Sequence, residues 1–430
     1  MNLTIHRGTQ EIGGSCVELR TNNTRLLIDF GIPLVTPQKH SFDIKLLNHK
    51  SIEDLRKSKI LPDIQGLYKN DQKGIDAILL SHSHLDHYGF LKYVNPDIPI
   101  YLSEGAKQLI DVSDIFIPFK AGGLNVTVMH KKRKLTIGDF VITPHLVDHS
   151  AFDALAFLIE ADGKRVFYSG DFRGHGRKGV LFERMTEHPP EDIDCLIMEG
   201  SMLGRSKQRY ENENEVQKRI EEILKVSDTI TFLFASSQNI DRIVSAYKAC
   251  RRTHSIFVID IYTAFILDKL RTVSEHIPQF NWKNVRVKFL ASHADAMVKH
   301  GYRDLLYTYN RRKIDMFEID RKKDKILMLA RDNSVFPSII KKLTKPKGAT
   351  IIYSMWEGYL SETFKKYCAE KGIAIEQVHT SGHAPLDDLQ AFAHAIDPTV
   401  LIPIHTFHGD RFHDLFENVK TLEDDETFTI

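Results

Sequence analysis

Residues 82–87 read His-Ser-His-Leu-Asp-His and hold four candidate metal ligands within six positions. They follow residues 75–80, an apolar run that is typical of a buried strand. Side chains two positions apart on an extended loop point the same way, so the first two histidines are expected to share one metal. The aspartate and the last histidine then face a second position. Imidazole and carboxylate ligands together favour zinc, with manganese or iron as alternatives.

Four later apolar runs end in polar clusters in the same way. The runs are residues 140–143, 165–168, 195–198 and 400–404, which lead into PHLVDHS, SGDFR, EGS and HTFH. In open α/β sheets, functional groups collect where strands end. We therefore expect these distant segments to meet at one site.

The middle of the chain alternates between helix and strand patterns. Val216, Ile220 and Leu224 recur at helical spacing, and an apolar run follows at residues 229–235. This alternation predicts a parallel, doubly wound domain. Apolar runs that end in candidate ligands occur again after this segment, which indicates an inserted rather than an appended domain. The predicted segments are residues 1–205, 206–375 and 376–430.

Composition narrows the class of protein. The chain has 430 residues, of which 42% are hydrophobic and 27% charged, as in an ordinary globular protein, so collagen-like, coiled-coil and disordered classes are excluded. Its net charge of +1 argues neither for nor against a nucleic-acid partner. Four scattered cysteines exclude a disulfide scaffold or a thiolate zinc cluster. Without a signal peptide or a membrane-spanning run, we expect a cytoplasmic protein that has no membrane partner.

The motifs resemble those of a known family. HSHLDH is similar to the HxHxDH signature of the metallo-β-lactamase fold, and the other signatures follow in order. They are Asp29 in LLIDFG, His149 in VDHS and Asp171 in YSGDFR, then Glu199 in MEGSMLG, His383 in HTSGHA and His405 in LIPIHTF. The last three match motifs A, B and C of the β-CASP nucleases. The chain is identified as RNase J-like, and we expect it to lack the C-terminal domain of that family.

The resemblance implies an α/β fold, an αββα metallo-β-lactamase sandwich with an inserted doubly wound α/β β-CASP domain. It also implies two zinc ions, with manganese as the alternative. The implied ligands are His82, His84 and His149 for the first metal, Asp86, His87 and His405 for the second, and Asp171 as the bridge. Asp29 would support the metal loop without touching a metal.

The implied chemistry is phosphodiester hydrolysis. Two metals about 3.5–4 Å apart can share a hydroxide, lower its pKa and hold both oxygens of an in-line displacement. By resemblance, His383 would protonate the leaving oxygen, and Glu199 would orient it and charge it. Asp86 would count both as a ligand and as a catalytic group.

The predicted function is therefore that of a metal-dependent nuclease. Its expected partner is nucleic acid, single-stranded RNA foremost, and a homo-oligomer is left open. The alternatives are a hydrolase of a small phosphodiester or other small substrate, and a DNA-processing nuclease. A non-catalytic nucleic-acid-binding protein is a third alternative, although every ligand position of the signature is filled.

Four residues are candidates for contact with substrate phosphate. Arg173 and Arg177 follow the bridging Asp171, Ser236 precedes a predicted helix, and Ser381 lies within HTSGHA. A helix start can hold a phosphate through its backbone donors. The alternatives are a solvated turn for the arginines and an ordinary helix cap for the serine.

The chain departs from RNase J at three loops. Asp260-Ile261-Tyr262 stands where the family carries a Gly-Arg-Ser phosphate-pocket sequence. Ser354-Met355-Trp356-Glu357 replaces a small Ser/Pro/Gly-rich loop, and Thr406-Phe407 replaces Gly-Glu. A pocket for a 5′-monophosphate is thus left open, as are endonuclease and exonuclease activity. Trp356 has two interpretations, base stacking in a cleft or core packing.

Overall fold

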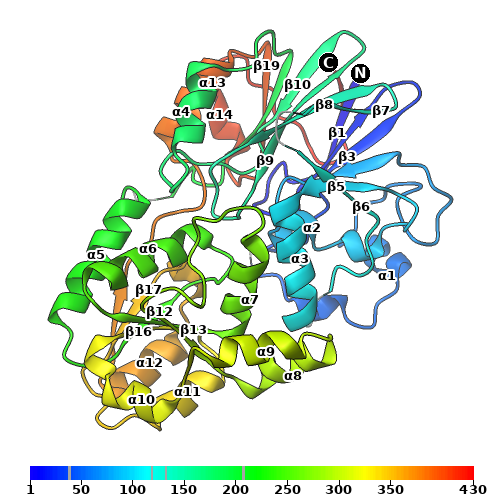
Figure 1. Ribbon diagram of the computed structural model, residues 1–430. Helices are drawn as coiled ribbons and strands as arrows, with labels where there is room; N and C mark the ends of the chain where they lie inside the picture. Colours follow the sequence, from blue (N-terminus) through cyan, green and yellow to red (C-terminus); the bar gives the residue numbers. More distant parts are fainter. Residues whose placement is uncertain (37–39, 118–119, 131–132, 206–208) are drawn as a thin grey trace.

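The computed structural model describes residues 1–36, 40–117, 120–130, 133–205 and 209–430. Its strands form three sheets of seven, six and seven strands (Figure 1). The two ends of the chain lie side by side, because the last strand pairs antiparallel with the first and places Thr429 opposite Asn2.

The first sheet is mixed. Its first three strands in chain order pair antiparallel, and the next three pair parallel. In spatial order the sheet contains β20 (Thr427–Thr429), β1 (Asn2–Arg7), β2 (Cys16–Arg20), β3 (Arg25–Ile28), β4 (Ala77–Leu79), β5 (Ile100–Ser103) and β6 (Val126–Met129).

The second sheet faces the first across a shared apolar core that includes Val17, Leu26, Phe157 and Ile197. In spatial order it contains β19 (Val400–Ile404), β11 (Cys195–Glu199), β10 (Lys164–Tyr168), β9 (Leu155–Ala161), β8 (Phe140–Leu146) and β7 (Leu135–Ile137). Helices cover the two outer faces over separate apolar clusters. They are α1 (Ile52–Lys57), α2 (Leu85–Tyr88) and α3 (Glu104–Phe116) on one side, and α4 (Val180–Glu187), α13 (Leu386–Ile396) and α14 (Phe412–Leu415) on the other. The predicted αββα sandwich is confirmed.

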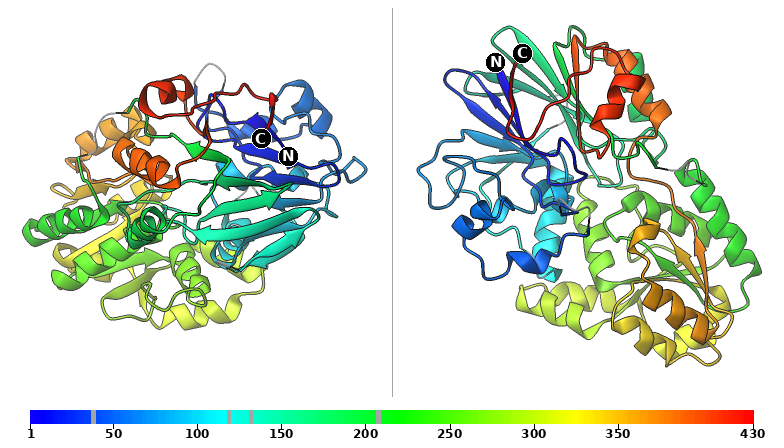
Figure 2. Two further views of the ribbon diagram at one scale, coloured as in Figure 1. Left: turned by 90° about the horizontal axis from the view of Figure 1, so that it is seen from above. Right: turned by 180° about the vertical axis from the view of Figure 1, so that it is seen from behind.

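The third sheet is parallel throughout. In spatial order it contains β15 (Lys313–Ile314), β14 (Val285–Lys288), β13 (Ile256–Asp260), β16 (Ile326–Ala330), β12 (Thr231–Phe234), β17 (Thr350–Tyr353) and β18 (Ala374–Gln377). Helices pack on both of its faces, which confirms the doubly wound prediction (Figure 2).

The helices of this part of the chain divide between the two faces. Those over one face are α5 (Glu213–Val226), α6 (Ile240–Arg252), α7 (Ile261–Leu270), α8 (Ala291–Lys299) and α9 (Arg303–Asn310), and those over the other are α10 (Met316–Arg321), α11 (Val335–Ile340) and α12 (Glu362–Lys371). Short 3-10 turns complete the elements: η1 (Ile44–Leu47), η2 (Leu91–Tyr93), η3 (Lys323–Lys325), η4 (Glu357–Tyr359) and η5 (Gly409–Arg411).

The third sheet is built from a segment that interrupts the second sheet. β11 and β19 pair parallel, with Glu199 opposite Ile404, although every strand of the third sheet lies between them in the chain. We propose a domain boundary after Gln377 rather than after residue 375, because β18 continues to that residue. The predicted boundary at residue 206 lies outside the described residues.

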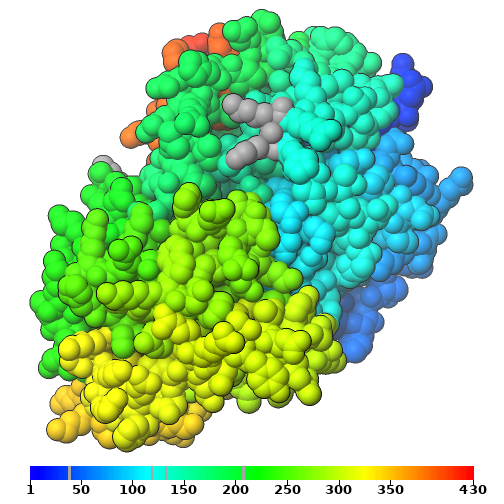
Figure 3. Space-filling model, in the orientation of Figure 1, coloured from blue at the N-terminus to red at the C-terminus, as the bar shows by residue number. Residues whose placement is uncertain are grey.

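The inserted part packs against the outer part through α3. Leu109 and Val112 of this helix lie in the same apolar cluster as residues of α6 and α7. In Figure 3 the cyan segment that contains α3 meets the yellow-green surface of the inserted part. This contact holds the third sheet beside the ends of the other two. Among the described residues, no helix has the length and apolar character required to cross a bilayer.

Candidate metal centre

The candidate ligands are carried by loops that begin where buried strands end. Residues 82–84 lie in the loop after β4, residues 85–87 lie in the first turn of α2 that follows it, and His149 follows β8. Asp171 follows β10, and His405 is the first residue after β19. Parallel pairing aligns the ends of β10, β11 and β19, so these loops open at one edge of the second sheet. The sequence therefore brings together side chains that lie far apart in the chain.

One group of three histidines gathers at this edge. The candidate ligand atoms of His82, His84 and His149 all lie within 4.8 Å of one another. Nε2 of His149 is 3.3 Å from Nδ1 of His84. Three imidazoles facing one space are a common donor set for a divalent metal.

A second group lies next to it. Asp86, His87 and His405 place candidate ligand atoms within 4.8 Å of one another. Oδ2 of Asp86 is 3.3 Å from Nε2 of His405 and 4.0 Å from Nε2 of His87. The mixed carboxylate and imidazole donors suit zinc or a harder metal such as manganese.

Asp171 lies between the two groups. Its Oδ2 atom is 3.2 Å from Nε2 of His87, 3.7 Å from Nε2 of His82 and 4.0 Å from Nε2 of His149. One carboxylate oxygen thus faces both groups, which is the position that a bridging ligand requires.

The nitrogens that face this space are fixed by contacts on their other side. Nδ1 of His87 lies 2.8 Å from Oδ2 of Asp29, and Nδ1 of His149 lies 2.6 Å from the carbonyl oxygen of Gly382. Nδ1 of His405 lies 2.7 Å from Oγ of Ser201. An imidazole held at one nitrogen presents the other to a metal in a set orientation.

Asp29 is wholly buried and serves several donors at once. Its carboxylate accepts hydrogen bonds from the Ser81 backbone N–H, the Ser81 hydroxyl and the Tyr168 hydroxyl, in addition to His87. These contacts give it the place expected for a support of the metal loop. Sequence reasoning missed Ser201 and Tyr168, although Ser201 stands two residues after Glu199 within EGS.

The donor set fits a bound cation. Nε2 of His82, Nε2 of His87 and Oδ2 of Asp171 are buried and make no hydrogen bond among the described residues. Buried polar atoms are otherwise almost always paired, so three that face one space indicate a ligand. Burial lowers the pKa of His82 and of His149 and brings that of His84 to about 4, which keeps these imidazoles neutral and able to bind a metal.

His383 and Glu199 form a dyad at the border of the cluster. Nδ1 of His383 lies 3.0 Å from Oε2 of Glu199 and 3.7 Å from Oδ2 of Asp171. Burial acts to lower the pKa of His383, but the negative charges of Glu199 and Asp171 outweigh it and raise that pKa to about 9. The His383 side chain is 21% exposed, whereas those of His82, His87 and His149 are 0% exposed.

Glu199 is held in place by the backbone around it. Its side chain is 1% exposed and accepts hydrogen bonds from the backbone N–H groups of Phe172 and Ser201. It lies at the end of β11, beside β19, so the pairing of these two strands sets its distance from His405. The carboxylate can therefore orient an imidazole without moving itself.

Comparisons with known proteins show which proteins this chain is similar to. Residues 53–231 match a family described as a beta-lactamase superfamily domain. An RNase J-like protein of Methanocaldococcus jannaschii is 24% identical over 308 residues, which cover 66% of this chain and 63% of the relative. A Ribonuclease J of Helicobacter pylori is 21% identical over 421 residues, which cover 94% of this chain and 56% of the relative. The chain is therefore similar to RNase J-like proteins over 66% to 94% of its length, and its residues 53–231 match the beta-lactamase superfamily domain.

Two further similarities extend the comparison. The transcription termination factor FttA of Methanothermobacter thermautotrophicus is 25% identical over 313 residues, which cover 66% of this chain and 45% of that protein. The chain thus spans between 45% and 63% of the length of these three curated relatives. A crystal structure of a protein of unknown function from Enterococcus faecalis V583 matches the whole chain with a TM-score of 0.80 at 22% identity, which shows the shared fold.

This RNase J-like chain places Arg173 differently from the prediction of a phosphate contact. The guanidinium is 0% exposed, and it donates to Oδ2 of Asp241 at 2.6 Å and to the carbonyl oxygen of Ser381 at 2.7 Å. Oδ1 of Asp148 lies 3.4 Å away. The buried charge needs acids and carbonyls around it, and these partners leave it no surface toward a substrate.

Arg177 is half-buried and also faces protein groups. It donates to Ser245 of α6 and to Asn214 and Gln217 of α5. Both arginines therefore join the outer part, which contains the first two sheets, to the inserted part, which contains the third. The positions of charges along the sequence cannot distinguish this role from a phosphate contact, because the polar groups that surround the two arginines come from distant segments.

Contact of the two serines with phosphate stays a prediction. Ser236 is exposed after β12, while the capping of α6 falls to Asn239, whose side chain accepts from the backbone N–H of Arg242. Oγ of Ser381 accepts from the backbone N–H of His383 at 3.0 Å. Ser381 thus lies beside the dyad, and Ser236 lies at the strand ends of the third sheet.

Proposed function

We propose that this chain is a dinuclear-zinc nuclease that hydrolyses phosphodiester bonds in single-stranded RNA, with manganese as the alternative metal. One observation carries the proposal: two groups of three donors and the carboxylate of Asp171 face one space, with the partly exposed His383 at its border. The names of the relatives, Ribonuclease J and RNase J-like protein, support RNA as the substrate.

We assign the ligands by position. His82, His84 and His149 would hold one cation, Asp86, His87 and His405 the other, and Asp171 would bridge them. When bound, the pair of cations supplies Lewis-acid activation of water and of the phosphate oxygens. Asp86 keeps a charged carboxylate for this purpose, because its hydrogen bond with His405 and the charge of His87 outweigh burial and bring its pKa to about 2.

The dyad supplies the proton for the leaving oxygen. Glu199 holds Nδ1 of His383, so the proton available for transfer is the one on Nε2. A pKa of about 9 keeps this imidazole protonated at neutral pH, and the positive charge of bound cations would bring that pKa down toward neutrality. A group that titrates near neutral pH is well matched to general acid catalysis.

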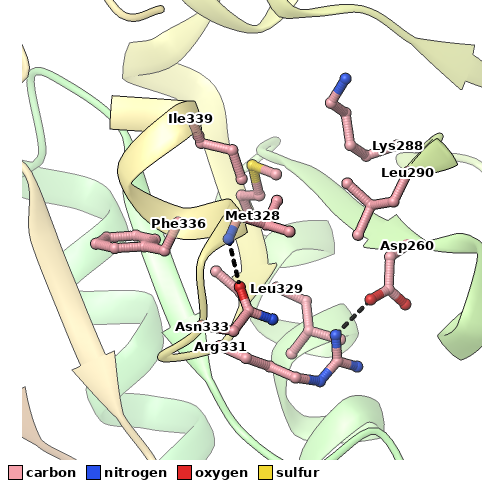
Figure 4. Close-up of a pocket in the computed structure, with 11 residues that line it drawn as sticks. Asp260, Lys288, Leu290, Met328, Leu329, Arg331, Asn333, Phe336 and Ile339 are labelled. Carbon is pink, nitrogen blue, oxygen red and sulfur yellow. Dashed lines mark hydrogen bonds and ion pairs between the residues drawn. The ribbon is translucent and has the colours of Figure 1, made fainter. Parts of the chain in front are cut away.

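We further propose that cleavage does not depend on a 5′-monophosphate. The loop that stands in place of the phosphate-pocket sequence of RNase J carries the buried Asp260, which pairs with Arg331 (Figure 4). Arg331 also donates to Ser237. The arginine is thus neutralised within the protein, and the carboxylate would repel a terminal phosphate.

The test is incubation of the zinc- or manganese-loaded protein with end-labelled single-stranded RNA that bears a 5′-phosphate, a 5′-triphosphate or a 5′-hydroxyl. We expect cleavage of all three, and its loss after chelation. His383→Ala should lower kcat by about 10²- to 10⁴-fold and leave the metal content, measured by mass spectrometry, unchanged. His394→Ala, which removes an exposed histidine of α13, is the matched control and should cleave like the original protein.

The product pattern also tests the rivals. Cleavage of single-stranded DNA at the same rate as RNA would favour a DNA-processing nuclease. Hydrolysis of a cyclic nucleotide without cleavage of RNA or DNA would contradict the proposal and favour a small-substrate hydrolase. Full activity of His383→Ala would remove that residue from the mechanism.

A further inference from the structure

Two aromatic side chains with large exposed surfaces stand together at the end of β17. Trp356 is 50% exposed and Tyr359 is 62% exposed, and η4 begins directly after Trp356. Their ring centroids are 5.2 Å apart with the planes at 88°. Exposed aromatic surface of this size costs free energy in water, so core packing does not account for it.

Arg205 joins this pair from the outer part of the chain. Its guanidinium carbon lies 5.4 Å from the centroid of the Trp356 ring. It comes six residues after Glu199, on the segment whose Ser201 contacts His405. A Cβ at Gly204 would collide with the ring of His408, so this segment is packed closely against the loop that carries His405.

The aromatic pair lies within electrostatic reach of the ligand groups. The pKa of Tyr359 is raised by burial of its hydroxyl and next by the negative charge of Asp86, while Arg205 opposes the rise. The pKa of Arg205 is lowered by burial and raised in turn by Glu199 and Tyr359. The charges of Asp86 and Glu199 thus act on these side chains, while much of Tyr359 remains exposed.

The Trp356 ring is also held in a defined orientation. A Cβ at Gly358 would overlap the ring, so the ring lies directly on the backbone of that residue. With the guanidinium of Arg205 close by, the indole is placed before any ligand arrives. A preplaced ring loses little conformational entropy when a flat ligand stacks on it.

We propose that Trp356, Tyr359 and Arg205 form a base-stacking subsite for single-stranded nucleic acid, beside the candidate metal centre. The inference rests on the proposed function and names the side chains through which the protein would hold a single strand. Aromatic faces stack on any base, and an arginine adds attraction to the base or to the neighbouring phosphate. Bases in a duplex are already stacked and paired, so they cannot enter such a subsite without being unstacked.

Fluorescence of Trp356 tests the stacking directly. The chain has two tryptophans, so Trp282→Phe leaves Trp356 as the only indole. This variant is combined with His383→Ala to slow turnover, loaded with zinc and titrated with a 12-nucleotide oligoadenylate. We expect saturable quenching by the single strand and none by the same oligonucleotide in a duplex. Loading and titration use the full chain.

Binding affinity gives the matched measurement. In the His383→Ala protein, Trp356→Ala should raise the Kd for the single strand about 5- to 150-fold, and Trp356→Phe should raise it less, because phenylalanine still stacks. Phe317→Ala removes a 78% exposed ring from α10. This helix lies below the third sheet in Figure 1, away from the first two sheets, so the Kd should be unchanged. Circular dichroism checks that each variant is folded.

The outcomes separate this inference from the proposed function. Quenching without any cleavage by the original protein would contradict the nuclease proposal and support the subsite. An unchanged Kd in a folded Trp356→Ala variant, with cleavage by the original protein intact, would overturn the subsite alone. Equal quenching by duplex and single strand would overturn its preference for single strands.

Discussion

Oδ2 of Asp29 lies 2.8 Å from Nδ1 of His87, and both side chains are wholly buried. The contact leaves Nε2 of His87 facing Asp171 without a hydrogen bond. Asp29 adopts a positive φ of 58°, which turns the chain after β3 so that its carboxylate reaches the loop after β4. A residue outside the HSHLDH run thus decides how its last histidine is oriented.

This relationship predicts the effect of Asp29→Asn. Asparagine tolerates the same positive φ, so the backbone is expected to persist. The loss of the carboxylate charge should weaken zinc binding at the second group by roughly 10- to 100-fold. Competition with a chelator measures the affinity. Asp192→Asn, at a 91% exposed position that also has a positive φ, is the control, and an equal loss in both variants would refute the specific role.

Glu199→Gln tests the dyad through its pH profile. The carboxylate raises the pKa of His383, so its removal should lower that pKa and move the alkaline limb of the kcat profile to lower pH. The sign follows because a general acid loses activity as the pH rises through its pKa. Metal content should not change. A profile that keeps its alkaline limb in place would show that Glu199 does not set the protonation of His383.

The buried pair of Arg173 and Asp241 predicts a stability effect. Asp241→Asn leaves the guanidinium without its closest carboxylate, and should lower the free energy of unfolding by about 3–5 kcal/mol. Urea denaturation followed by circular dichroism measures the change. Lys57→Met breaks the exposed pair with Glu53 and should change the free energy of unfolding little, because water screens that pair. Similar losses from both variants would contradict a special role for the buried pair.

Asp260 predicts a stability change on the acid side. Burial acts to raise its pKa, but Arg331 and His293 outweigh burial and lower it from 3.8 to about 2. A depressed folded-state pKa stabilises the protein above the unfolded value, and this contribution is lost as the pH falls from about 4 to about 2. The loss should be about 2 kcal/mol. Denaturation at pH 5 and at pH 2.5 should therefore differ less in Asp260→Asn than in the original protein, and an unchanged difference would refute the pairing.

Much of the fold could be predicted from local patterns. Short apolar runs that end in polar clusters identified the strand ends, and helical spacing identified α5 and α6. Their order along the chain indicated an inserted parallel domain, which the three sheets confirm. These features depend on residues that are neighbours in sequence, so periodicity alone reveals them.

The predicted metal site followed from residue types and their order. HSHLDH, His149, Asp171 and His405 were placed in two groups with a bridge, and the structure brings them together in that arrangement, although their role as ligands stays a prediction. The orienting contacts of Ser201 and Tyr168 could not be anticipated, because nothing in the local sequence pairs them with His405 or Asp29.

By itself, then, the sequence determined the fold class and which side chains are candidates for metal binding and for the dyad, because these lie at strand ends within recognisable runs. Only the tertiary structure decided that Arg173 turns inward to Asp241, that Asp260 neutralises Arg331, and that Trp356 lies exposed next to Arg205. The physical reason is that burial and pairing of a charge or a ring depend on partners from distant segments, which chain folding alone brings within contact distance.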